Sequence, residues 1–163
     1  MTDARELDPR FIPQQRLVGR LTAVAFTGPS LIVLLIVLAA ADDLPTWGRV
    51  ALGVLWLALI AGLVWHAERW PARVYACTRY ALDADGLVIQ RGVYWRSVTY
   101  VPRSRVQHTD VSQGPLERHY GLGTLVVYTA GTNHARVSLP GLAHEVAMAL
   151  RDDLRLGGHD DVV

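Results

Sequence analysis

Two long uncharged segments dominate the first half of the chain. Residues 21–41 and 50–67 contain no Asp, Glu, Lys or Arg. As helices rising ~1.5 Å per residue they measure about 32 and 27 Å, close to the ~30 Å hydrocarbon core of a bilayer. We therefore predict two transmembrane helices, joined by the short polar connection 42–49 into an antiparallel hairpin.

Two other interpretations fit the apolar pattern less well. A buried helix pair in a soluble all-α core rarely needs uncharged stretches of this length. A cleaved signal peptide would use the A-x-A-like site at Ala39–Ala41. The apolar run is longer than the ~7 to 15 residues of such a leader, which disfavours cleavage.

Arginine placement predicts the orientation of the hairpin. The connection 42–49 holds one arginine and two aspartates, whereas the outer flanks of the two spans are basic, with Arg5, Arg10, Arg16 and Arg20 before the first and Arg69, Arg73 and Arg79 after the second. Positive flanks stay in the cytoplasm. Both termini are therefore expected on the cytoplasmic side of the inner membrane.

Within the second span, Trp56 must face lipid or the partner helix, and the small pair Ala58 and Gly62 permits a close helix approach.

After Pro71 the pattern changes to short segments rich in Val, Tyr and Thr, separated by Gly, Asp and Asn. These segments predict strands at 74–82, 87–91, 96–101, 106–112, 124–129 and 135–139, with hairpin turns at 83–86 and 130–133. An amphipathic helix is predicted from Gly141, with an apolar stripe formed by Leu142, Val146, Ala149, Leu150 and Leu154.

The predicted fold class is an α+β membrane protein. A transmembrane hairpin precedes a partly open antiparallel β-barrel or sandwich, which the C-terminal helix caps. The expected parts are a cytoplasmic N-terminal segment (1–20), the hairpin (21–67, with spans 21–41 and 50–67), the β-domain (73–155) and a flexible tail (156–163).

Composition and charge narrow the function classes. The formal net charge is +1, so the chain has no overall excess of positive charge for nucleic acid, and no nucleic-acid partner is expected. The single cysteine, Cys77, cannot form an internal disulfide, which is typical of a reducing compartment. In its predicted strand, Cys77 is expected to be a small buried thiol.

Two groups of residues are candidate binding surfaces. Residues 86–109 contain no acid and four arginines, namely Arg91, Arg96, Arg103 and Arg105. On one face they would contact the anionic inner leaflet or an acidic partner; the alternative is solvated charges that protect strand edges. The turn-rich segment 113–123 is either a tight crossover or a partner loop, with candidate contacts Gln113, Leu116, Arg118 and Tyr120.

A metal site is conceivable around His108 and Asp110, which are two apart on a predicted strand, with Glu117 and His119 in the next turn. No cysteine or second spaced histidine pair completes a tetrahedral set. We therefore predict no metal site, no cofactor and no catalytic residues.

A family resemblance rests on residues 101–107 (Val-Pro-Arg-Ser-Arg-Val-Gln), residues 113–122, Thr129–Gly131 and Leu139–Leu142. In these motifs the chain resembles the bacterial pleckstrin-homology-like family of YdbS-type membrane proteins, over roughly 73–154 and the hairpin before it. The resemblance implies a pleckstrin-homology-like barrel and no established enzymatic activity. Phosphoinositide binding is not expected, because the turn 83–86 carries two aspartates that would repel phosphate.

The expected function is a non-enzymatic, membrane-anchored interaction or scaffold module. Its partners would be the lipid bilayer and either another membrane protein or further copies of itself. The alternative is an anionic-lipid or small-ligand-binding domain that uses the arginine-rich hairpins.

Overall fold

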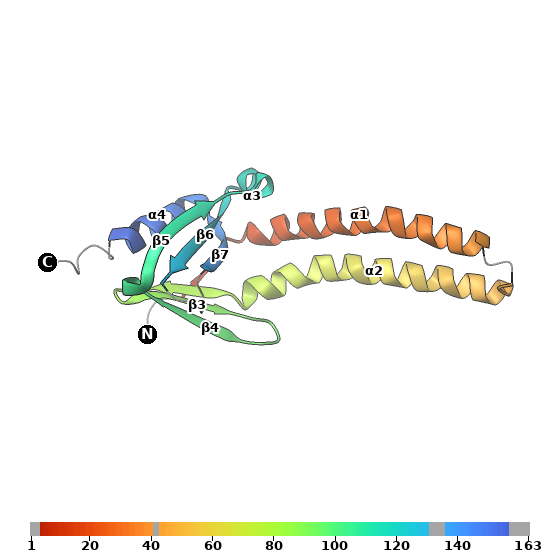
Figure 1. Ribbon diagram of the computed structural model, residues 1–163, viewed down its shortest axis with the longest axis horizontal. Helices are drawn as coiled ribbons and strands as arrows, with labels where there is room; N and C mark the ends of the chain where they lie inside the picture. Colours follow the sequence, from red (N-terminus) through yellow and green to blue (C-terminus); the bar gives the residue numbers. More distant parts are fainter. Residues whose placement is uncertain (1–3, 41–42, 131–135, 157–163) are drawn as a thin grey trace. The chain divides into compact units, whose positions relative to one another are not determined.

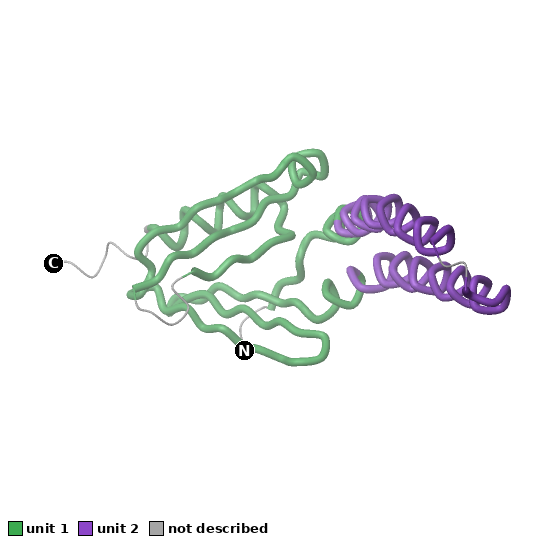
Figure 2. The backbone as a smooth tube through the Cα atoms, turned by 45° about the vertical axis from the view of Figure 1, so that its right-hand side comes forward, with its two compact units in different colours: residues 1–14, 72–163 green, residues 15–71 purple. Residues whose placement is uncertain are grey.

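The computed structural model describes residues 4–40, 43–130 and 136–156, and the chain divides into two compact units (Figure 2). One unit comprises residues 1–14 and 72–163, and the other comprises residues 15–71. The predicted tail beyond residue 156 and most of the predicted turn 130–133 lie outside the described residues.

Two long helices run through the apolar segments. Helix α1 spans Phe11–Ala40 and helix α2 spans Thr46–Ala76, and both are long and apolar enough to cross a membrane. Large aliphatic side chains along them, such as Val24, Val54 and Leu55, remain exposed in the protein itself. Such surfaces lose their contact with water only when lipid covers them.

Inside the unit formed by residues 15–71, small residues bring the two helices together. A Cβ added to Gly19 would lie 2.7 Å from the Cβ of Ala67, whereas one added to Gly62 would meet nothing within 4 Å. The predicted pair Ala58 and Gly62 is thus not where the helices approach most closely. Trp56 faces the partner helix, and its Nε1 donates to the Ser30 hydroxyl at 3.1 Å.

A cluster of charges joins the same two helices. Arg20 Nε donates to a Glu68 carboxylate oxygen at 2.6 Å. Arg16 Nε donates to the Glu68 carbonyl oxygen at 3.2 Å. This ionic link lies one residue from Ala67, so the close helix approach and the salt bridges stabilise the same part of the hairpin.

The β-domain consists of two antiparallel sheets and a C-terminal helix (Figure 1). Strands β1 (Arg5–Glu6), β2 (Arg79–Leu82), β3 (Gly86–Arg91) and β4 (Ser97–Pro102) form the first sheet in sequence order. Strands β5 (Val106–Ser112), β6 (Leu122–Thr129) and β7 (Arg136–Ala143) form the second. The connections include the 3-10 turn η1 (Arg103–Arg105) and α3 (Pro115–Tyr120), and α4 (His144–Leu156) ends the described chain.

The predicted fold class is confirmed, in its open form. Among the described residues β4 and β5 are not paired with each other, so the two sheets make a sandwich and no closed barrel. Their apolar inner faces share one core with α4. Its fully buried members include Leu87, Ile89, Leu122, Leu125, Leu139, Leu142 and Leu154.

The N-terminal segment belongs to this core. Leu7 and Phe11 are buried in it, β1 pairs with β2, and the Asp8 amide donates to the Gly141 carbonyl at 2.8 Å. Gly141 has a φ of 80°, and a Cβ there would lie 2.6 Å from the Phe11 ring. Residues 4–14 therefore pack with the β-domain, where the sequence pattern suggested a separate segment 1–20.

Two predicted boundaries are wrong. Residues 74–76, predicted as strand, belong to α2. Val74 and Tyr75 pack against the core from this helix. The final helix begins at His144 and not at Gly141, because β7 continues to pair with β6 through Leu142 and Ala143. On this helix Ala147, Leu150 and Leu154 are buried in the core and Val146 packs against it, whereas Ala149, predicted in the stripe, is exposed.

The Gly19–Ala67 approach predicts a position-specific effect on the helical hairpin. Replacing Gly19 with Val should lower the midpoint of thermal unfolding in mild detergent, because overpacking costs about 1–3 kcal/mol. The matched control is Gly62→Val, which adds the same atoms where nothing lies within 4 Å. Equal midpoints for the two variants would contradict this assignment.

Candidate functional site

The four candidate arginines do not share one face. Arg91 and Arg96 flank the turn between β3 and β4, and Arg103 and Arg105 belong to η1 at the other end of β4. Six strand residues separate the pairs, which is about 20 Å at ~3.3 Å per residue. The structure therefore separates the predicted arginine surface into two places with different surroundings.

Arg103 has a structural role. Its Nε donates to the Asp83 carbonyl at 3.2 Å, and its Nη1 donates to the Asp153 carbonyl at 2.6 Å. Its Nη2 also lies 3.3 Å from the Asp153 carboxylate, and only 14% of the side chain is exposed. Arg103 thus joins the β2–β3 turn to the last turns of α4, leaving little of it for an external partner. Arg105 is exposed.

Arg91 lies between the two sheets. Its Nη2 donates to the carbonyl oxygen of Ser138 on β7, whereas its Nε is buried and has no partner among the described residues. Burial lowers the pKa of Arg91, because desolvation disfavours the charged form. No carboxylate of the described residues compensates this cation.

A pocket of about 250 Å³ adjoins Arg91, and we call it the arginine pocket. Its polar lining consists of Arg79, Gln90, Arg91, Arg96 and Ser97, together with Cys77. Strand pairing places Arg79 opposite Gln90 and Arg91 opposite Ser97 at this end of the first sheet. The sequence pattern missed Arg79, whose proximity to the other arginines depends on the β2–β3 pairing.

Tight backbone geometry shapes the rim of this pocket. Gly92 begins the β3–β4 turn with a φ of 121°, and a Cβ there would lie 1.7 Å from the carbonyl oxygen of Trp95. Only glycine fits this conformation, because any side chain would collide with the turn. Gly92 therefore sets the path that brings Arg96 back beside Arg91.

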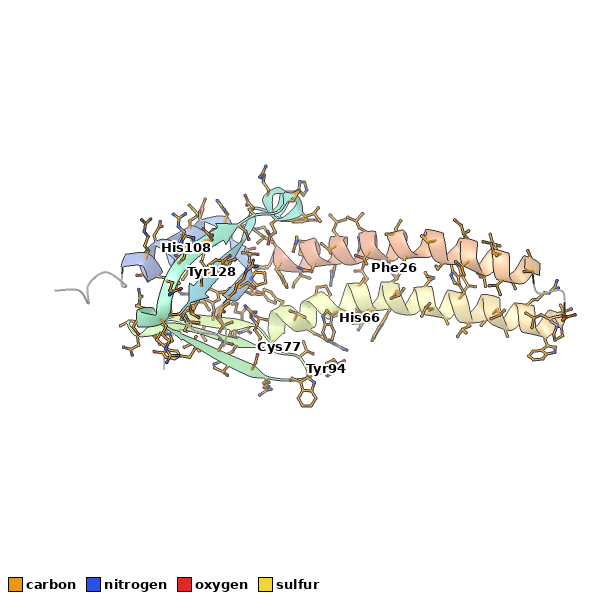
Figure 3. All side chains as sticks on the ribbon, viewed as in Figure 1. Phe26, His66, Cys77, Tyr94, His108 and Tyr128 are labelled. Atoms are coloured by element: carbon orange, nitrogen blue, oxygen red, sulfur yellow. The ribbon has the colours of Figure 1, made fainter. Side chains whose placement is uncertain are left out.

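Large apolar side chains on the β3–β4 hairpin face solvent. The exposed fractions are 75% for Tyr94, 90% for Trp95, 67% for Val98 and 51% for Tyr100. We call these four residues the hairpin apolar surface; Figure 3 shows Tyr94 at the hairpin turn. Strand β4 is also the last strand of its sheet among the described residues. The sequence pattern predicted the strand but not this exposure.

The predicted partner loop is a short capped helix. The Gly114 amide donates to the Glu117 carboxylate at 2.8 Å, and Gln113 Nε2 donates to the Leu122 carbonyl at 2.7 Å. Tyr120 packs against the core, Leu116 is half-buried and Arg118 is exposed. These hydrogen bonds and core contacts explain the local sequence without a partner.

The histidines considered for a metal lie on different elements. His108 Nε2 lies 3.2 Å from the Asp110 carboxylate, and both residues line a groove between β5 and α4. His119 instead contacts the Tyr120 ring on α3. The part of the chain that the structure describes contains no group of three or more His, Cys, Asp or Glu side chains placed to hold a metal ion.

Cys77 is exposed, so its predicted burial is wrong. It follows the last residue of α2 (Figure 3), and it lines the arginine pocket. The prediction failed because residues 74–76 continue the helix, which moves Cys77 out of a strand and into a turn.

Comparisons with known proteins identify related sequences. The family described as "Bacterial PH domain" matches residues 19–156. The chain is also similar to UPF0699 transmembrane protein YdbS of Bacillus subtilis (strain 168), with 36% identity over 130 residues, which cover 77% of this chain and 78% of that protein. No solved structure matches the chain.

The contacts of Arg103 predict a stability role. Replacing Arg103 with Gln should lower the free energy of unfolding of the full-length protein in detergent by about 1–3 kcal/mol, because two carbonyl oxygens lose a charged donor. Denaturant unfolding measures the change. Arg105→Gln is the matched control and should leave stability within ~0.5 kcal/mol. A similar loss in both variants would refute the assigned role.

Proposed function

The chain belongs to the bacterial PH domain family of membrane proteins, and from this premise we propose that it is a non-enzymatic interaction module assembling with other proteins in its membrane. The partner is a second copy of the chain or another membrane protein. The β-domain lies on the cytoplasmic side of the inner membrane in this proposal, as the arginine flanks indicate.

The hairpin apolar surface carries the proposal. Exposed aromatic and aliphatic side chains on a short hairpin are unfavourable in water, and Trp and Tyr are enriched where proteins contact each other. Strand β4 adds unpaired backbone donors and acceptors on its outer edge, within the described residues. A partner strand or helix placed there would cover both the apolar side chains and this edge.

The two transmembrane helices favour assembly because they hold both partners in the same membrane. Proteins held in one membrane meet at higher effective concentration than free proteins, so a modest interface is sufficient. The membrane-spanning assignment of the helices is supported by the similarity to a transmembrane protein and by their exposed aliphatic surfaces.

The test is the assembly state of the full-length protein in mild detergent. We expect light scattering to show a defined homo-oligomer, or mass spectrometry to show a stoichiometric companion protein. Trp95→Ser combined with Tyr100→Ser should dissociate either complex, because both changes remove apolar area from the hairpin apolar surface.

The matched control is Trp47→Ser, which removes another exposed indole, 76% exposed against 90% for Trp95, outside the β-domain. This variant should keep the wild-type assembly. A monomeric wild-type protein without a companion would overturn the proposal, and so would a double variant that assembles normally.

A further inference from the structure

The arginine pocket has the chemistry of an anion site. We infer that it binds the phosphate group of an anionic ligand, held chiefly by Arg91 and Arg96. This inference goes beyond the proposed function and does not depend on protein assembly.

The charge balance of the pocket is positive. None of the residues lining it is acidic. Arg79 is neutralised by Glu6, whose carboxylate lies 2.8 Å from its Nη2. Arg91 contacts only a carbonyl oxygen, and Arg96 has no side-chain partner among the described residues. Two guanidinium groups therefore remain without a compensating carboxylate.

The position of Arg91 makes an external anion favourable. A cation partly removed from water loses hydration, and a carbonyl dipole restores only part of that energy. The Nε of Arg91 is buried and has no hydrogen-bond partner among the described residues, so part of the lost hydration energy is not recovered. An anion in the adjoining pocket would supply the missing electrostatic stabilisation at short range.

The donors around the pocket suit a phosphate group. Guanidinium groups match phosphate oxygens with paired hydrogen bonds, and arginine is favoured where such planar recognition occurs. Gln90 and Ser97 add an amide and a hydroxyl donor to the same lining. A volume of about 250 Å³ falls below the ~300–1,000 Å³ of drug-sized sites, so it suits a single phosphate group.

The acidic turn at residues 83–86 does not interfere with this site. It lies at the opposite end of β3 from Arg91, because that strand runs from Gly86 to Arg91. Five residue steps at ~3.3 Å correspond to about 17 Å, beyond the ~8–10 Å over which exposed charges interact at physiological salt. The aspartates of the turn therefore leave the pocket's potential positive.

Two sources offer the same phosphate chemistry, a phospholipid headgroup and a free phosphate ion. In the sequence, Ala76, which lines the pocket, lies only nine residues beyond the predicted second span. Tyr94 and Trp95 on the same hairpin are residue types that partition to the headgroup region. These observations favour the headgroup as the source.

The experiment uses full-length protein in an uncharged detergent and isothermal titration calorimetry. The probes are inorganic phosphate, dihexanoyl phosphatidylglycerol and, as the zwitterionic comparison, dihexanoyl phosphatidylcholine. We expect saturable binding of at least one anionic probe, with affinity reduced about five- to tenfold in Arg96→Gln. Arg105→Gln is the charge-matched control outside the pocket and should bind as the wild type does.

The two anionic probes distinguish a phospholipid headgroup from a free phosphate ion. Saturable binding of phosphatidylglycerol with little binding of inorganic phosphate supports the headgroup. Binding of inorganic phosphate supports a free phosphate ion as the ligand. Either result supports the site if Arg96→Gln weakens the binding and Arg105→Gln does not. Equal weakening in Arg96→Gln and Arg105→Gln overturns the site, as does the absence of saturable binding by either anionic probe. Light scattering of the same samples reports assembly independently.

Discussion

The β-domain depends on one apolar layer that three groups of residues share. The inner faces of two sheets contribute Leu87, Ile89 and Leu125, and α4 closes the layer with Leu150 and Leu154. Since removing these side chains from water is the main driving force, the positions of the other elements follow from it. Phe11 extends the layer to the N-terminal segment, which explains the glycine at position 141.

Polar features appear where this apolar layer ends. Arg91 is on the core side of β3 at its last residue, so its guanidinium reaches across to a carbonyl of β7 instead of entering the core. Arg103 has a comparable position at the other end of β4, but Asp153 neutralises it. The two arginines thus differ in electrostatic state: Asp153 neutralises Arg103, whereas no carboxylate of the described residues pairs with Arg91.

The open sandwich leaves β4 as an edge strand with exposed apolar side chains, within the described residues. Strand β4 is not paired with β5 in the described part of the chain, and its outward side chains Val98 and Tyr100 remain exposed. The segment 113–123 is internally satisfied by its cap, by Gln113 and by the packing of Tyr120. The large exposed apolar side chains of the β-domain therefore lie on the β3–β4 hairpin and not on that segment.

The sequence by itself determined the two apolar helices, the strand-rich domain and the helix that caps it. Charge-free length and residue periodicity are local properties, and each follows from the chain without knowledge of its neighbours. Only the tertiary structure decided that Tyr75 packs from a helix, that Gly19 meets Ala67, and that Arg79 lies beside Arg91. The physical reason is that strand register, helix crossing and the burial of a charge depend on residues distant in sequence, whose pairing a local pattern does not contain.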